Sequence, residues 1–302
     1  MSNAFEEFAK CKDDFTYFAK TYIKITHPKR GLIPFEIHDY QKKLVKTYED
    51  QRFVIAKKFR QGGITTLTVM WLLWKCMFAS EQRIFFACKT NHEAIHVGKL
   101  ITLAIDNMPE WLKPRLTVNN QHEKKFAMTN SQIYFGVFHA ARSKALTHLV
   151  VDEAAFISNM EEHWKAMYPT LSVGGRAIIL STVNGFGNWF ANTWFAAEEG
   201  KNQFYTVQID YFEHPDYNNQ AWVDAMKKNL GELGWRQEVL GDFIIYDTPE
   251  VEKIAIEHAQ RLSDWELGQR VRSLAWRFKR KKKDIESYAF LIEAWKRLSD
   301  MV

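Results

Sequence analysis

Residues 56–74, AKKFRQGGITTLTVMWLLW, contain most of a phosphate-binding loop but lack its usual lysine. The P-loop pattern is G-x-x-x-x-G-K-[ST], in which the lysine reaches the outer phosphates and the hydroxyl residue binds Mg²⁺. With Thr65 in the hydroxyl position, Gly63 matches the second glycine. Ile64 then stands at the lysine position, and Lys58 stands at the position of the first glycine. The loop is therefore missing one mobile positive charge.

Other groups around this loop are suited to binding an anion. The two adjacent glycines permit a turn that points successive backbone N–H groups inward, and a helix beginning near Thr65 would direct its positive end to the same place. Lys58, or else Lys57, can supply the missing cation from the end of the preceding strand, and Arg60 adds a second. The alternative is an ordinary Gly-Gly turn between a strand and a helix, with basic surface residues beside it.

A pair of acids follows the loop by about ninety residues. The segment HLVVDEAAF (148–156) is an apolar strand that ends in Asp152 and Glu153. An acid at such a strand end holds the magnesium site of P-loop nucleotide hydrolases, and a neighbouring glutamate can act as the general base toward water. Adjacent acids are also common at solvated strand ends. The pair therefore indicates a nucleotide site only in combination with the P-loop-like segment that precedes it.

The elements that must position these groups alternate along the chain. Helical patterns span Thr65–Ala79 and residues 92–108, and a hairpin is expected over 119–138, which would make the sheet mixed. Apolar runs typical of strands that are covered on both faces occupy residues 52–58, 83–89, 131–138, 147–152, 176–183 and 204–209. This alternation predicts an α/β fold with a mainly parallel sheet flanked by helices.

The composition is that of a globular intracellular protein. The chain has 302 residues, 46% of them hydrophobic and 15% aromatic, and a net charge of +5 that is compatible with a nucleic-acid partner without indicating one. Its three cysteines form no C-x-x-C pair, which favours reduced thiols over disulfides or a zinc site. Neither a secretory signal nor an apolar run long enough to span a bilayer is recognisable.

The sequence pattern changes after about residue 247, from alternating strands and helices to a mostly helical stretch. We expect one domain over residues 1–247, which would contain the P-loop and the two acids as a P-loop ATPase domain, and a small helical appendage over 248–302. The appendage contains the basic run Lys279–Lys283, which is either a sequence-independent DNA contact or a solvated helix face.

Five segments, taken in order, resemble the ATPase domain of the large terminase subunit, the DNA-packaging motor of tailed bacteriophages. FEIHDYQKKLV (35–45) resembles the adenine-recognition segment, and KFRQGGITT resembles the R-Q-x-G-K-T-T loop apart from Ile64. Some terminases carry a displaced loop lysine at the position of Lys58. The remaining three matches are ARSKALTHLVVDE (141–153), the coupling segment ILSTVNG (179–185) and the Q-E segment WRQEVLGDF (235–243). The resemblance covers roughly residues 14–247 and implies a P-loop ATPase fold of the RecA-like class.

The resemblance also implies a role for each matched residue. Glu153 would be the general base, Arg142 an arginine finger acting on its own or a neighbouring subunit, and Lys58 the loop cation. Thr65 and Asp152 would hold Mg²⁺. The coupling residues would be Ser181, Thr182 and Asn184. The nucleotide-binding set would be Gln41, Lys58, Arg60, Gln61, Gly62, Gly63, Ile64, Thr65, Thr66 and Asp152.

The resemblance implies an ATP- and Mg²⁺-dependent motor that moves double-stranded viral DNA into a procapsid. Its implied partners are the portal protein and the small terminase subunit. The segment after residue 247 shows no strand framework for a nuclease, so the nuclease is either a separate subunit or a part truncated from this chain. The active form would be a homo-oligomeric ring in the host cytoplasm, transiently at the portal. Two alternatives remain: a helicase-like ATPase, and a nucleotide-binding structural subunit that has lost hydrolysis, for which Ile64 is the best argument.

Overall fold

An eight-stranded sheet forms the centre of the computed structural model, which describes residues 2–27, 29–138 and 145–243. The strands lie in the order β10-β3-β9-β8-β4-β7-β6-β5. Strands β10, β3, β9, β8, β4 and β7 are parallel, whereas β6 is antiparallel to both β7 and β5. Their bounds are β3 Phe53–Lys57, β4 Arg83–Cys88, β5 Leu116–Asn119, β6 Glu123–Phe126, β7 Gln132–Val137, β8 His148–Val151, β9 Arg176–Ser181 and β10 Tyr205–Gln208. The predicted mixed α/β sheet is therefore confirmed.

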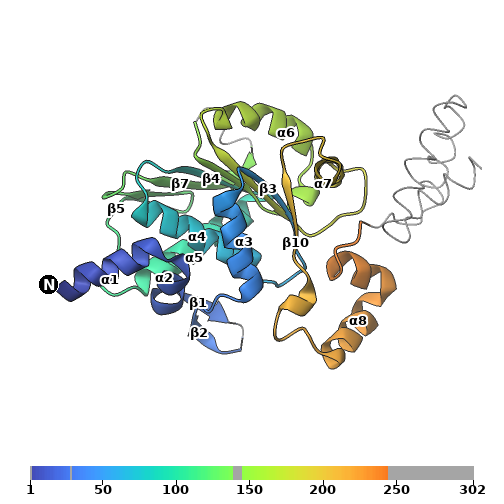
Figure 1. The fold of residues 1–302 in the computed structure, drawn as a ribbon, viewed down its shortest axis with the longest axis horizontal. Helices are drawn as coiled ribbons and strands as arrows, with labels where there is room; N and C mark the ends of the chain where they lie inside the picture. Colours follow the sequence, from blue (N-terminus) through green and yellow to red (C-terminus); the bar gives the residue numbers. More distant parts are fainter. Residues whose placement is uncertain (1, 28, 139–144, 244–302) are drawn as a thin grey trace, which may run out of the picture. The chain divides into compact units, whose positions relative to one another are not determined.

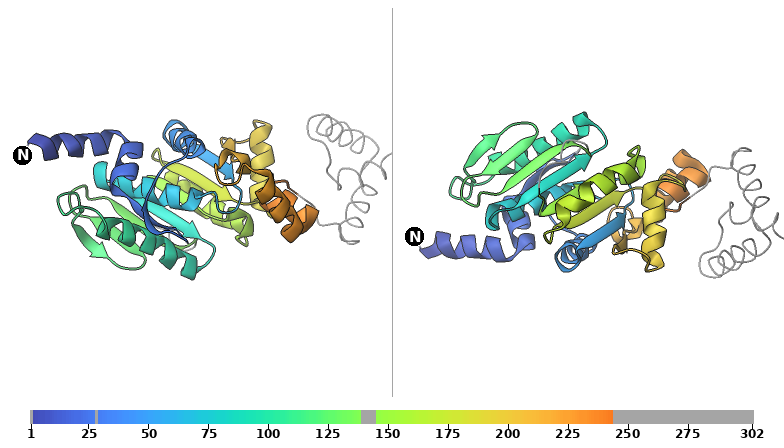
Figure 2. Two further views of the ribbon diagram at one scale, coloured as in Figure 1. Left: turned by 90° about the horizontal axis from the view of Figure 1, so that it is seen from below. Right: turned by 90° about the horizontal axis from the view of Figure 1, so that it is seen from above.

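Helices cover the sheet on both faces (Figures 1 and 2). The connections from β3 to β4 and from β4 to β7 progress in one direction across the sheet, while those from β8 to β9 and from β9 to β10 progress in the other. Because parallel crossovers are right-handed, the two sets of helices lie on opposite faces. The helices are α3 Asp39–Asp50, α4 Ile64–Phe78 and α5 Asn91–Asp106 on one side, and α6 Met160–Met167 and α7 Trp189–Glu198 on the other.

Four further elements precede α3, and helix α8 lies after β10. Helices α1 and α2 are followed by a two-stranded antiparallel sheet, β1 and β2, which contacts α5 and α2. Helix α8 follows β10 and is kinked at Gly231, where φ is 67°. Their bounds are α1 Ser2–Asp13, α2 Phe15–Tyr22, β1 Lys24–His27, β2 Gly31–Pro34 and α8 Gln220–Glu238.

Burial explains why the central strands read as continuous apolar runs. Every residue of β3 and of β8 is buried, as expected for strands between two helical layers. Helix α4 is apolar nearly all round, and its Trp71 is fully buried. The predicted helix Thr65–Ala79 begins and ends one residue earlier in the structure, at Ile64 and Phe78.

The strand order determines which loops can meet. In a parallel sheet the carboxyl ends of the strands lie at one edge, and ligands bind outside that edge. Strand β9 lies between β3 and β8, so the segment after β9 lies between the glycine loop after β3 and the acids after β8. Three segments far apart in the sequence are thereby brought together.

The chain divides into two compact units. The first comprises residues 1–183 and 188–241 and contains every element named above. The described part of the second consists of Asn184–Gly187 with Asp242 and Phe243, and the rings of Phe186 and Phe243 pack 5.9 Å apart. The predicted helical appendage, 248–302, and its basic run lie outside the described residues.

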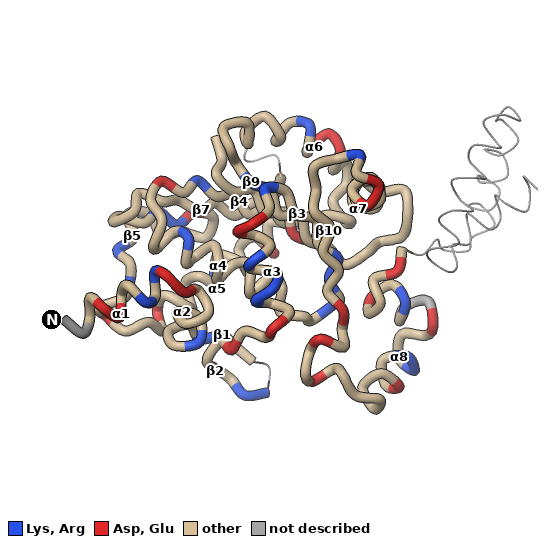
Figure 3. Tube along the Cα trace, in the orientation of Figure 1, with Lys and Arg blue, Asp and Glu red and all other residues tan. Residues whose placement is uncertain are grey.

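Two further properties of the described residues concern the distribution of charge and the apolar character of the helices. Lysine and arginine are interspersed with aspartate and glutamate along the described trace, so charge alone does not single out a DNA-binding face there (Figure 3). Within that same part of the chain, no helix combines the length and apolar character needed to cross a membrane.

Candidate functional site

The loop between β3 and α4 makes a sharp turn that depends on left-handed backbone conformations. Gly63 caps the helix with φ of 70°, and Gln61 has φ of 64°. Glycine adopts this region without the steric cost that a side chain brings, whereas Gln61 holds it as a non-glycine residue. The turn places the free N–H groups of the first turn of α4 at the edge of the sheet.

Two side chains of α3 fix this turn through one carbonyl. The Gly62 oxygen accepts hydrogen bonds from the Tyr40 hydroxyl at 2.7 Å and from the Gln41 amide at 3.2 Å. Gln41 is buried, and its other amide atom, the oxygen, accepts from the backbone N–H of His38 at 3.0 Å. A Cβ on Gly62 would come within 2.9 Å of the Phe59 ring, so the loop needs a glycine there. Gln41 thus stabilises the loop between β3 and α4 through its hydrogen bond to the Gly62 carbonyl.

The two adjacent lysines at the end of β3 are both buried but point to different surroundings. The Lys57 ammonium donates to the Gly241 carbonyl at 3.0 Å and lies 4.8 Å from the centre of the Trp194 ring. Lys58 instead faces Asp152. Of the two candidates for the missing loop cation, Lys58 is the one beside the acids.

Lys58 is the centre of a compact polar cluster. Its ammonium lies 2.7 Å from Asp152 Oδ1, 3.1 Å from Glu153 Oε1 and 3.1 Å from Thr65 Oγ1. The Thr65 hydroxyl donates to the other oxygen of Asp152 at 2.7 Å. Burial alone would lower the pKa of Lys58, but the two carboxylates outweigh it and the pKa is raised. The ammonium is therefore firmly protonated.

The second acid, Glu153, follows β8 and is hydrogen-bonded by residues at the end of β9. Glu153 adopts a left-handed conformation, with φ of 52°. Its Oε2 atom accepts from the Ser181 hydroxyl at 3.4 Å, and from the backbone N–H and hydroxyl of Thr182 at 3.3 and 3.4 Å. Ser181 is fixed in turn because its oxygen accepts from the Ala155 N–H at 3.1 Å. The predicted coupling residues Ser181 and Thr182 thus contact the predicted general base.

Other predicted residues lie away from this cluster. The Arg60 guanidinium pairs with Glu238 of the Q-E segment. The Ile64 side chain is buried in the core, so only its backbone N–H can serve a ligand, and Thr66 is a half-buried residue in the first turn of α4. Asn184 belongs to the second compact unit. Arg142 lies outside the described residues.

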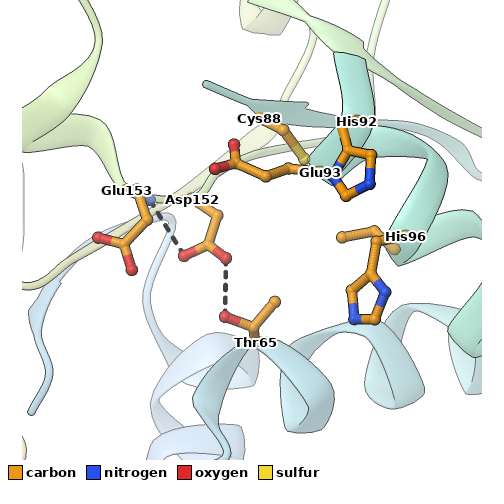
Figure 4. A pocket seen from close by; sticks show the side chains of 8 residues that line it. Thr65, Cys88, His92, Glu93, His96, Asp152 and Glu153 are labelled. Carbon is orange, nitrogen blue, oxygen red and sulfur yellow. Dashed lines mark hydrogen bonds between the residues drawn. The ribbon is translucent and has the colours of Figure 1, made fainter. Parts of the chain in front are cut away.

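A cavity of about 300 Å³ adjoins the cluster. Its walls are formed by Thr65, Cys88, His92, Glu93, His96, Val97, Asp152 and Glu153. Figure 4 shows the two imidazole rings across the cavity from Asp152 and Glu153. Burial, with a smaller contribution from Asp152, raises the pKa of the Cys88 thiol, so this cysteine is a poor nucleophile at neutral pH.

The histidines of the cavity wall are absent from the predicted site. The only signal for them in the sequence is HEAIH, residues 92–96, which has the H-E-x-x-H spacing of zinc metalloproteases. Among the residues that the structure describes, however, no three His, Cys, Asp or Glu side chains are grouped to hold a metal ion. The spacing therefore places two imidazoles on one helix face without completing a zinc site.

The donor set fits magnesium better than a transition metal. Mg²⁺ prefers hard oxygen ligands and is usually held by one or two carboxylates together with substrate phosphates, not by a closed protein cage. The Thr65 hydroxyl and the Asp152 carboxylate, 2.7 Å apart, are oxygen ligands of this kind. The cluster also contains a cation, a helix N-terminus and a carboxylate for accepting a proton, which are the groups that phosphoryl transfer to water requires.

The fold of this chain is similar to that of several solved protein structures. No protein-family model matches the sequence. The ATPase domain of the large terminase of Thermus phage P74-26 superposes with a TM-score of 0.57 at 17% identity, covering 70% of this chain and 95% of that one. The large terminase of bacteriophage HK97 gives a TM-score of 0.63 at 12% identity, over 76% of this chain and 55% of that one. A third, from the thermophilic bacteriophage D6E in complex with ADP, gives 0.54 at 13% identity, over 69% of this chain and 54% of that one.

The matched region thus corresponds to an isolated ATPase domain and to about half of a whole large terminase. The described chain has the P-loop α/β fold of the ATPase domain of bacteriophage large terminases.

Proposed function

We propose that this chain is an ATP-hydrolysing motor subunit that translocates double-stranded DNA. The observation that carries the proposal is the cluster of Lys58, Thr65, Asp152 and Glu153 at the carboxyl edge of the sheet. Two strands that are separated in the sequence, β3 and β8, converge to build it, and its groups are those of a nucleotide hydrolase. Lys58 supplies the positive charge that Ile64 cannot.

Binding of the nucleotide would use the glycine turn and the first turn of α4. The backbone N–H groups there favour phosphate oxygens because they are unpaired within the helix and lie at its positive end. Thr65 and Asp152 would hold Mg²⁺, which neutralises charge on the phosphates when bound. Lys58 would turn from the carboxylates toward the outer phosphates. The D6E relative, in complexes with ADP and with ATP-gamma-S, supports a nucleotide ligand for this fold.

Hydrolysis would rely on Glu153. Its carboxylate accepts the proton of the attacking water while the water oxygen bonds to the γ-phosphorus. The bond from that phosphorus to the bridging oxygen breaks, and its electron pair leaves with ADP. Ser181 and Thr182 orient the carboxylate through the contacts described above, so they can transmit its state to β9.

The remaining roles rest on the resemblance to large terminases. Arg142 is proposed as the arginine finger, in its own or a neighbouring subunit, and Asn184 as a coupling residue. The proposed partners are DNA, the portal protein, the small terminase subunit and a separate nuclease subunit. A homo-oligomeric ring at the procapsid portal, in the host cytoplasm, is the proposed active form.

The competing proposal is a nucleotide-binding subunit without hydrolysis, which the substitution at Ile64 favours. Phosphate release by the full chain with MgATP, measured with and without double-stranded DNA, separates the two. A motor releases phosphate faster when DNA is present, and Glu153→Ala abolishes that release. Nucleotide binding without release in the wild type, under every assembly condition, would favour the inactive subunit.

A further inference from the structure

The first two turns of α5 present two histidines to the cavity beside the acids. His92 and His96 are one helical turn apart, so they share a face, and both line the cavity (Figure 4). Both side chains are exposed in the described structure, which excludes the ordinary role of a satisfied core histidine. Their rings carry N–H donors to a wall of a cavity whose other charged residues are the acids Glu93, Asp152 and Glu153.

The start of α5 is fixed, which in turn fixes the direction of this face. Thr90 accepts a hydrogen bond from the Glu93 N–H at 3.2 Å, and Glu93 Oε2 accepts from the Thr90 N–H at 3.0 Å. This reciprocal capping box determines where the helix begins. Deeper along α5, Gly98 lies so close to the Gln121 carbonyl that a Cβ would approach it to 2.7 Å. The histidines therefore stand on a constrained element.

The acids of the cavity already have donors from the protein. Asp152 is bound by Lys58 and Thr65, Glu153 by Lys58 and the end of β9, and Glu93 by its own capping box. Lys58 and Thr65 lie on the same side as Asp152 and Glu153, so an anion in the cavity would need hydrogen-bond donors on the facing wall as well. The imidazole rings of His92 and His96 lie on that wall. A metal ion is the weaker candidate because the described residues offer no third protein ligand beside the two histidines.

We propose that His92 and His96 bind the terminal phosphate of the nucleotide and retain it as inorganic phosphate after cleavage. This inference rests on the proposed ATPase function and adds a phosphate-contacting wall to that site. The ligand is a phosphate oxyanion, which accepts hydrogen bonds from both rings. The cavity adjoins Thr65 and Glu153, so the retained phosphate would lie next to the groups that bind metal and activate water.

The test measures, by calorimetry, the affinity of inorganic phosphate for the full chain saturated with MgADP. The variant His92→Ala with His96→Ala should bind phosphate about tenfold more weakly or worse, because two donors to a charged ligand are lost. The variant with glutamine at both positions keeps an N–H donor and should recover most of the affinity. His122→Ala is the matched control, since His122 is exposed and lies outside the cavity wall.

The outcomes separate this inference from the function on which it rests. MgADP affinity should change less than about threefold in the alanine pair, which shows that the nucleotide site is intact. Equal phosphate affinity in wild type and the alanine pair would overturn the histidine assignment while leaving the ATPase proposal standing. Failure of the wild type to bind MgADP would overturn both. In single turnovers, the alanine pair should release phosphate faster after cleavage than the wild type does.

Discussion

The Lys58 ammonium lies 2.7 Å from the Asp152 carboxylate, although the two residues are 94 positions apart. The same ammonium contacts the Thr65 hydroxyl, so it touches both groups that we propose as ligands for Mg²⁺. A cation at this point opposes a divalent ion through charge repulsion. On our proposal, the loop lysine and the metal would therefore compete for the same oxygens until phosphates drew the lysine away.

This competition predicts a gain of metal binding on removal of Lys58. In Lys58→Met without nucleotide, Mn²⁺ should bind about tenfold more tightly or better than in the wild type, because one nearby positive charge is gone. Electron paramagnetic resonance of free Mn²⁺ measures the affinity. Adding Asp152→Asn to Lys58→Met should remove the gain. Unchanged Mn²⁺ affinity in Lys58→Met would contradict the competition.

Replacing Glu153 by glutamine should separate binding from hydrolysis. The amide keeps the size of the side chain but cannot accept the water proton, so kcat should fall by about 10²-fold or more. ATP affinity, measured by equilibrium titration, should change by less than about threefold. Glu81→Gln is the control, since Glu81 is an exposed carboxylate that pairs with Arg83. Retention of wild-type kcat in Glu153→Gln would exclude this residue as the base.

The end of β9 should affect turnover more than binding. Ser181→Ala combined with Thr182→Val removes two of the donors to Glu153, while the Thr182 backbone N–H remains. We expect kcat to fall about 3- to 30-fold with little change in KM, since an orienting contact is lost and no contact to the nucleotide changes. The conservative variant Thr182→Ser, with Ser181 intact, should keep near-normal kcat. A change confined to KM would argue against orientation of the base.

The support of the glycine loop can be measured as stability. Tyr40→Phe and Gln41→Ala each remove a donor to the Gly62 carbonyl, and each should cost about 1 kcal/mol in the free energy of unfolding, with more for the buried amide. Because the two donors share one acceptor, the double variant should depart from additivity by about 0.5 kcal/mol or more. Urea unfolding of the four proteins measures this coupling. Strict additivity would show that the contacts are independent.

Much of the scaffold follows from the sequence because its signals are local. Strands covered on both faces must be continuously apolar, and β3 and β8 are. The meeting of Lys58 with Asp152 follows from parallel strands ending at one edge. The hairpin expected over residues 119–138 is also present, as β6 and β7.

The rest depends on contacts that no local pattern encodes. The choice between Lys57 and Lys58 depends on which surroundings each side chain reaches, and Trp194 and Gly241 lie far along the chain from both. The Tyr40 contact to the loop likewise joins segments 22 residues apart. His92 and His96 were missed because their spacing suits any exposed helix face, and only the packing of α5 brings them to the cavity. The β1–β2 pair was missed because its strands are short and mostly exposed.

The central claim is that Lys58 replaces the lysine missing from the loop, and its neighbour provides a matched comparison. Lys57→Met and Lys58→Met remove the same charge from adjacent buried side chains. Lys58 is one partner of a buried ion pair, and removing such a partner costs about 3–5 kcal/mol, so folding of both variants is verified by thermal unfolding. DNA-stimulated ATPase activity is then measured. The account predicts that kcat/KM falls about 10²- to 10³-fold in Lys58→Met and less than about fivefold in Lys57→Met. Equal activity of folded Lys58→Met and wild type, or a loss confined to Lys57→Met, would contradict it.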